Sequence, residues 1–230
     1  MSGIMVLIHG RHLEADGWER VIWGDPKNGI FGQASLGVAL ALKLGAQAIY
    51  WGSGASEKDG LKESQCAFMH AVAHGSSLSA LEGFDPYEIE SILKEKSILD
   101  LTTQNTEEEI TGALEKCQQL GIKRLYLVSA PTHISRCALL VEQLREQGKA
   151  GGIDIYTKAS DVPYIGYTVQ DVVVVEPPQR GDVPKWQTFR YVQAMFGIMH
   201  KSDAAFASFL SELGELLQKY NVRVDWEPRA

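Results

Sequence analysis

The chain has 230 residues, of which 45% are hydrophobic and 22% are charged, and such values are ordinary for one globular domain with a full core. Its net charge of -7 and its pI near 5.4 argue against a nucleic-acid partner, because binding to a phosphate backbone needs clusters of basic side chains. The unpaired cysteines, the lack of a basic leader region and the lack of any run of about 20 apolar residues predict a cytoplasmic protein with no membrane partner.

Short apolar runs alternate with longer amphipathic segments along the first half of the chain. The apolar runs predict strands at residues 4–8, 48–51 and 97–101. The amphipathic segments predict helices at residues 33–44, 61–74, 86–96 and 106–120, and Pro86 and Gly121 suit the start and the end of the helices they adjoin.

The second half of the chain continues the alternation. It predicts strands at residues 124–129, 153–156 and 172–175 and helices at residues 132–147, 188–196 and 202–220. The run of four valines at 172–175 is apolar on both faces, as in a central parallel strand. The order of elements predicts a Rossmann-like α/β fold, a doubly wound and mostly parallel sheet with helices on both faces, in a single domain over residues 1–230.

Polar residues collect where the predicted strands end. Ligands of open parallel sheets bind beyond the carboxyl ends of the strands, so this recurrence predicts a ligand pocket at that edge. The residues that follow five of the strands are Gly10 and Arg11, then Gly52, Ser53 and Gly54, then Thr103, Asn105 and Thr106, then Ser129, Thr132, His133 and Arg136, and last Glu176 and Arg180.

The Gly52-Ser53-Gly54 turn has two interpretations. Glycine removes the steric barrier to a turn whose backbone N–H groups approach a phosphate or carboxylate. The alternative is a tight connection from strand to helix. The segment is neither a P-loop, since the ending of lysine followed by serine or threonine is missing, nor the dinucleotide fingerprint, whose spacing differs.

Asn105 and Thr106 open a predicted helix. Asn105 is a good N-cap, and Glu108 sits where its carboxylate can complete a capping box. Glu107, Glu108 and Glu109 suit the positive end of the helix dipole. Capping is therefore the structural alternative to a role for Asn105 in ligand binding.

His133 and Arg136 lie three residues apart in the first turn of a predicted helix, so both project from one face. A helix N-terminus favours an anion, and Arg136 adds a bidentate donor for phosphate or carboxylate. His133 can exchange a proton near neutral pH, so it is the candidate catalytic residue. The alternative is a histidine and an arginine on an exposed helix face.

No set of residues converges as metal ligands in the sequence. His70 and His74 are four residues apart but lack a neighbouring glutamate and a third ligand, so we expect no metal site. Cys66, Cys117 and Cys137 fall in predicted helices and are interpreted as buried free thiols.

Three segments carry a family resemblance. They are the Gly52-Ser53-Gly54 turn with Glu63 on the next helix, the segment TQNTEEE at 103–109, and the segment VSAPTHISRC at 128–137. Together they resemble the bacterial domain-of-unknown-function family that includes YdcF, SanA and ElyC, whose patterns are an S-G-G-like turn, S-x-N-T-x-E-N and V-T-S-x-x-H-x-x-R-A. The chain departs from these patterns in Thr103, in Glu109 and in its G-S-G turn.

The resemblance implies a Rossmann-like core over about residues 1–150 and a polar pocket that includes Glu63. The region from Ile153 onward is then a C-terminal extension that completes the sheet and adds helices. For YdcF the resemblance implies binding of S-adenosylmethionine, and for SanA and ElyC a membrane-anchored role in the cell envelope. This chain shows no anchor, so the envelope role is not carried over.

The leading hypothesis is a small-molecule enzyme, a transferase or hydrolase acting on a nucleotide-like or phosphorylated substrate. In it Arg136, Asn105 and the glycine turn hold the anion. One alternative is a non-catalytic protein that binds S-adenosylmethionine or a nucleotide, with Asp100 as the acidic partner of the ribose. Another is a structural or interaction protein whose polar loops cap helices. A homo-oligomer is left open.

Overall fold

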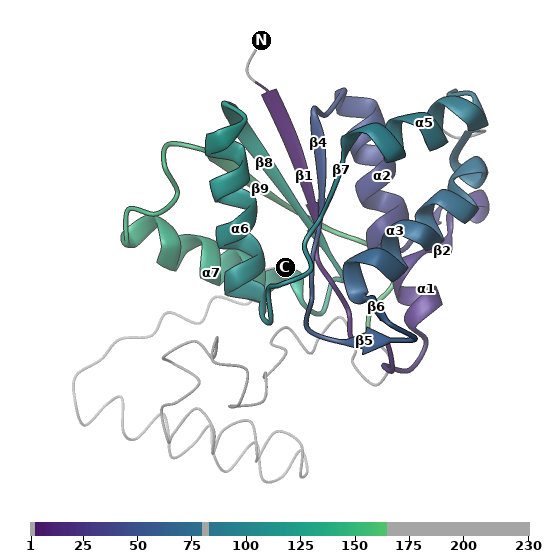
Figure 1. Ribbon diagram of the computed structural model, residues 1–230, viewed down its shortest axis with the longest axis horizontal. Coiled ribbons are helices and arrows are strands. Elements are labelled where there is room, and N and C mark those ends of the chain that lie inside the picture. The colour runs from purple at the N-terminus through teal and green to yellow at the C-terminus, as the bar shows by residue number, and fades with distance from the viewer. Residues whose placement is uncertain (1–2, 80–82, 165–230) are drawn as a thin grey trace, which may run out of the picture. The chain divides into compact units, whose positions relative to one another are not determined.

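A five-stranded parallel sheet forms the centre of the fold. The computed structural model describes residues 3–79 and 83–164, and its five long strands pair in the order β7-β4-β1-β8-β9 (Figure 1). Every neighbouring pair in this sheet is parallel. The strands are β1 (Gly3–Ile8), β4 (Ala48–Trp51), β7 (Ser97–Leu99), β8 (Ile122–Ser129) and β9 (Asp154–Ala159). The predicted Rossmann-like α/β fold is confirmed.

Helices cover both faces of the sheet. One face packs against α2 (Gln33–Leu44), α3 (Glu63–His74) and α5 (Pro86–Lys96), and the other packs against α6 (Thr106–Gln119) and α7 (Ile134–Glu146). Because side chains alternate along a strand, Val6 and Ile8 join the first core and Met5 and Leu7 join the second. The remaining elements are α1 (Trp18–Ile22), β2 (Gly24–Asp25), a 3-10 turn (Pro26–Asn28), β3 (Ile30–Phe31), β5 (Glu57–Lys58), β6 (Leu61–Lys62) and a second 3-10 turn (Gly75–Leu78).

The strand order reverses between β1 and β8. The chain moves outward from β1 to β4 and β7, and then returns through α6 to β8 on the other side of β1. Ile8 pairs with Val128, so His9 and Ser129 leave the sheet side by side, and the His9 N–H donates to the Val128 carbonyl at 3.1 Å. Ligands of such sheets bind at this reversal, the topological switch point.

Several predicted element ends differ from the structure for local reasons. The predicted helix at 132–147 begins at Ile134, because residues 130–133 form a turn in which the N–H groups of His133 and Ile134 both donate to the Ala130 carbonyl. The predicted helix at 61–74 begins at Glu63, after the small β5–β6 hairpin. Helix α2, strand β4 and helix α5 have the predicted bounds.

Part of the prediction lies outside the described residues. This holds for the strand at 172–175, the helices at 188–196 and 202–220, and Glu176 and Arg180. The described residues all fall within one compact unit, Met1–Asp182, and the prediction of a single domain over residues 1–230 stays a prediction. Within residues 3–79 and 83–164, no helix is long and apolar enough to cross a membrane.

Candidate functional site

His9 forms a buried ion pair with Glu109. His9 directly follows β1, Glu109 lies in the first turn of α6, and the His9 Nδ1 is 2.6 Å from the Glu109 Oε2. The two residues are 1% and 5% exposed. Burial alone would lower the pKa of His9, but the neighbouring Cys137 sulfur and Glu109 carboxylate together raise it to about 10. The imidazole is therefore positively charged at neutral pH.

His133 lies across the switch point from His9. It is the N-cap residue of α7, and the two ring centroids are 5.7 Å apart with nearly perpendicular planes. The His133 Nδ1 is 2.8 Å from the Ser129 Oγ, and its Nε2 is 3.2 Å from the Thr106 Oγ1. The Cys137 Sγ lies 3.7 Å from the same Nδ1. Both ring nitrogens of His133 are thus engaged by hydroxyl groups of the protein.

Glu63 adds a second buried carboxylate beside the pair. Ser53 and Ser56 donate their hydroxyl hydrogens to its two oxygens at 2.6 Å each. Burial raises the pKa of Glu63, and the charge of Glu109 acts in the same direction, while the two hydroxyl groups oppose the rise. We define the switch-point cluster as His9, Glu63, Glu109, Ser129 and His133.

Two glycines make room for these carboxylates. A Cβ at Gly10 would lie 2.6 Å from the Glu63 Oε2, and a Cβ at Gly52 would lie 2.6 Å from the Glu109 Cδ and Oε2. Gly54 packs against the loop after β7, where its N–H donates to the Thr103 carbonyl at 2.9 Å. The predicted glycine turn therefore packs around the two carboxylates, which favours the interpretation of a tight connection.

Arg11 and Tyr164 lie beside His133. The Arg11 guanidinium sits 4.0 Å from the centre of the Tyr164 ring, and this ring stacks on His133 with centroids 5.9 Å apart. The Thr132 hydroxyl accepts from the Tyr164 backbone N–H at 3.2 Å. Thr132 therefore holds the residue that covers His133, and its contact with an anion stays a prediction.

Arg136 is 1% exposed and His133 is 5% exposed. The interpretation of these two residues as a surface pair is therefore wrong. Arg136 lies in the first turn of α7, next to the cluster, as the sequence predicts.

Asn105 is a helix cap. Its Oδ1 accepts from the Glu108 N–H at 2.9 Å, and its Nδ2 donates to the Glu108 Oε1 at 2.9 Å. The other Glu108 oxygen accepts from the Gln104 N–H at 2.8 Å, rather than from the Asn105 N–H as a capping box requires. The Thr106 hydroxyl, one residue further, contacts the switch-point cluster through His133.

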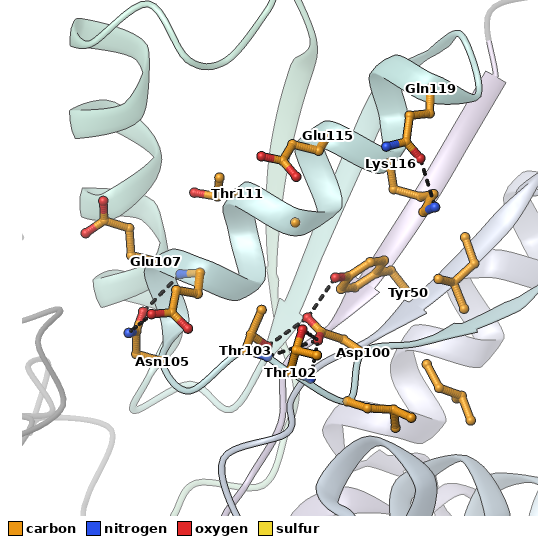
Figure 2. Close-up of a pocket in the computed structure, with 15 residues that line it drawn as sticks. Tyr50, Asp100, Thr102, Thr103, Asn105, Glu107, Thr111, Glu115, Lys116 and Gln119 are labelled. Atoms are coloured by element: carbon orange, nitrogen blue, oxygen red, sulfur yellow. Dashed lines mark hydrogen bonds between the residues drawn. The ribbon is translucent and has the colours of Figure 1, made fainter.

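An open groove of about 880 Å³ runs along α6 beside the end of β7 (Figure 2). Asp100 lies at its base, where its carboxylate accepts from the Tyr50 hydroxyl at 2.7 Å and from the hydroxyl and N–H of Thr103 at 2.7 and 3.1 Å. Burial raises the pKa of Asp100, but these hydrogen bonds and those from Thr102 outweigh it, so the pKa is lowered. Thr103 and Asn105, which the sequence places at a strand end, line the groove, as does Asp100, the candidate partner of a ribose.

The groove and the switch-point cluster are different places. The Asp100 carboxylate of the groove accepts its hydrogen bonds from its own loop and from Tyr50, and Glu107, Glu108 and Glu115 give the rim of the groove a negative charge. The cluster contains the buried ion pair of His9 and Glu109 and the buried carboxylate of Glu63. We therefore assign the candidate site to the cluster, on its chemistry rather than on volume.

The sequence interpretation missed His9, Glu109 and Tyr164 as site residues. His9 directly follows the first strand, and this position was the signal that could have identified it. Glu109 was explained by the helix dipole, because only the packed structure shows that it faces His9. Cys117 and Cys137 are buried and Cys66 is partly buried, and all three are free thiols.

The ring centroids of His70 and His74 lie 4.2 Å apart with tilted planes, beside Trp18 and Trp23. In the part of the chain that the structure describes, no group of three or more histidine, cysteine, aspartate or glutamate residues is arranged to hold a metal ion.

The chain matches no protein-family model, and neither a curated protein nor a solved structure matches it. The resemblance to the family that includes YdcF, SanA and ElyC therefore stays a prediction.

Proposed function

We propose that the protein is a small-molecule enzyme, a transferase or hydrolase, that acts on a phosphorylated or nucleotide-like substrate at the switch-point cluster. The observation that carries this proposal is the pair of imidazoles His9 and His133. They face each other at the carboxyl ends of β1 and β8, the place where open α/β sheets bind their ligands.

The charges around the cluster favour an anionic ligand. His9 carries a positive charge, and Arg11 and Arg136 lie on the adjoining turn and helix. The first turn of α7, a helix of 13 residues, follows His133 and adds the partial positive charge of its N-terminus. A phosphoryl group bound there could accept hydrogen bonds from each of these elements.

Proton chemistry favours an enzyme over a binding protein. Groups whose surroundings shift their pKa values from the ordinary range are typical of sites that transfer protons. Here the pKa of His9 is raised by Cys137 and Glu109, and the pKa of Glu63 is raised by burial. The binding-protein alternative relied on Asp100 as a ribose partner, but hydrogen bonds from its own loop and from Tyr50 already occupy both of its oxygens.

The test is a thermal-shift panel of nucleotides, sugar phosphates, inorganic phosphate and S-adenosylmethionine, the ligand that the resemblance implies. We expect a phosphorylated compound to raise the melting temperature of the wild type and of Asn105→Ala, a change in the groove. We expect a much smaller rise for Arg11→Gln. Compounds that bind are then screened for loss of the phosphoryl group and for group transfer.

Two results would contradict the proposal. One is a panel in which no phosphorylated compound shifts the melting temperature. The other is a shift that survives in Arg11→Gln but disappears in Asn105→Ala, because the ligand would then occupy the groove.

A further inference from the structure

The two ring nitrogens of His9 differ in their hydrogen bonds within the described residues. Its Nδ1 is engaged by Glu109, whereas its Nε2 is buried and makes no hydrogen bond within residues 3–79 and 83–164. The Cys137 sulfur is its polar neighbour, and sulfur is a weak acceptor. Buried donors in proteins are nearly always paired, so an N–H that no described residue pairs, on a charged ring, is a position at which we expect an acceptor from a ligand.

His133 differs from His9 in this respect. Hydroxyl groups of Ser129 and Thr106 engage both of its nitrogens. The role of proton donor, which the sequence predicts for His133, therefore fits His9 better. The Nδ1 of His9 contacts a carboxylate, and its Nε2 makes no hydrogen bond within the described residues. In this arrangement a carboxylate orients an imidazole for acid–base catalysis.

We propose that the His9 Nε2–H donates a hydrogen bond to an anionic oxygen of the ligand, and that Glu109 is a positioning residue that holds the ring in this orientation. This inference rests on the proposed function and assigns the proton donor within it. When the bond from phosphorus to the leaving oxygen breaks, Nε2 gives its proton to that oxygen. A bond forms from the attacking oxygen to phosphorus, its proton passes to solvent, and solvent returns a proton to Nε2.

The groups that face His9 set its charge. The Cys137 sulfur from α7 and Glu109 from α6 raise its pKa, and the ring of His133 lies beside it on the turn before α7. Glu63 on α3 lies beside the adjacent Gly10. The donor therefore stays protonated through neutral pH and loses its proton only as pH approaches about 10. The Glu109 carboxylate is one of the two groups that oppose the effect of burial, so its removal should lower the pKa of His9, and the donor should be lost at a lower pH than in the wild type.

The experiment measures binding of inorganic sulfate, an anion whose charge is constant over this range, by NMR of the histidine ring nitrogens between pH 6 and 9. In the wild type we expect sulfate to shift the His9 Nε2 signal, with a Kd that changes less than about twofold across the range. In Glu109→Gln we expect the Kd to rise about tenfold for each pH unit above the lowered pKa. Glu109→Asp should restore most of the flat profile.

His12→Gln is the matched control, since His12 is an exposed histidine three residues further along the same loop. It should bind sulfate as the wild type does. If Glu109→Gln does not fold, titration of His9 in the wild type still tests the inference. A pKa well above 6.5 would support it, and a pKa near 6.5 would overturn it.

The two proposals fail differently. Sulfate that shifts His133 and the first turn of α7 but leaves the His9 Nε2 signal unmoved would overturn the role of His9 and leave the proposed function standing. A pH profile that is the same in Glu109→Gln as in the wild type would overturn the role of Glu109. Sulfate that shifts no signal of the switch-point cluster would overturn both proposals.

Discussion

The groove and the switch-point cluster lie at the same edge of the sheet, and each is built around a buried carboxylate. Asp100 in the groove accepts hydrogen bonds from Tyr50 and from the adjacent Thr102 and Thr103. Glu109 in the cluster pairs with His9, which is 100 residues away in the sequence. The partners of Asp100 are neutral near pH 7, because burial and Asp100 itself raise the pKa of Tyr50, whereas the partner of Glu109 is charged.

This difference separates a structural carboxylate from a functional one. Neutral donors lower the pKa of Asp100, so its charge does not change near neutral pH, and it holds its loop. The Cys137 sulfur and Glu109 instead raise the pKa of His9, whose Nε2 makes no hydrogen bond within the described residues. The groove therefore offers fewer groups for proton transfer than the cluster, and each of the following experiments compares the two regions.

The largest expected effect is the loss of stability in Glu109→Ala. Removing one partner of a buried ion pair costs about 3–5 kcal/mol, because the other charge is left uncompensated. Urea denaturation at pH 6 would measure this loss, with Glu107→Ala in the same helical turn as the control, expected within about 0.5 kcal/mol of the wild type.

The pH dependence of that loss follows from the raised pKa of His9. The contribution of the pair is complete below the unfolded pKa of 6.5 and disappears as pH rises toward about 10. The difference between Glu109→Ala and the wild type should therefore shrink from pH 6.5 to pH 10. A difference that stays constant over this range would show that His9 is neutral in the folded protein.

Asp100→Ala should lower the free energy of unfolding by about 1–3 kcal/mol, because donors of Thr102 and Thr103 lose their acceptor. Since the pKa of Asp100 is lowered, its contribution is complete above 3.8 and is lost only as pH falls below that value. The loss should be the same at pH 6 and pH 9, and sulfate binding should be unchanged. A loss that varies between these two pH values would place Asp100 in contact with an ionisable partner.

Asn105→Ala should have the smallest effect, about 1 kcal/mol, which is the usual cost of removing an N-cap side chain. Thermal denaturation would measure it, and ligand affinity should stay within about twofold of the wild type. A loss of affinity of tenfold or more would return Asn105 to the binding site and make the groove the better candidate.

The architecture could be predicted from the sequence because its signals are local. The run of apolar residues in β8 and the Gly45 stop after α2 each reflect a property of a few adjacent residues. The clustering of Ser129, His133 and Arg136 at one strand end was also predictable, since parallel strands place their carboxyl ends together.

The pairings inside the site could not be predicted in the same way. In the sequence, Glu109 is one of three consecutive acidic residues in a helical turn, and nothing distinguishes it from the other two. The packing of α6 on the sheet is what places Glu109, and not its neighbours, against His9. Tyr164 follows β9 and contacts His133, which lies 31 residues earlier. Helix and strand periodicity relate only residues that are close in sequence, so they do not predict this contact. The burial of Arg136 likewise depends on how α7 packs on the sheet.

The most direct test of the central claim is to map the binding site of the phosphorylated compound that gives the largest thermal shift. Backbone amide NMR signals would be recorded as this compound is added to the full chain. The account predicts that the signals of Gly10, Arg11 and residues 129–133 move first and furthest. Movement confined to Thr103, Asn105 and Lys116 would place the ligand in the groove and contradict the assignment.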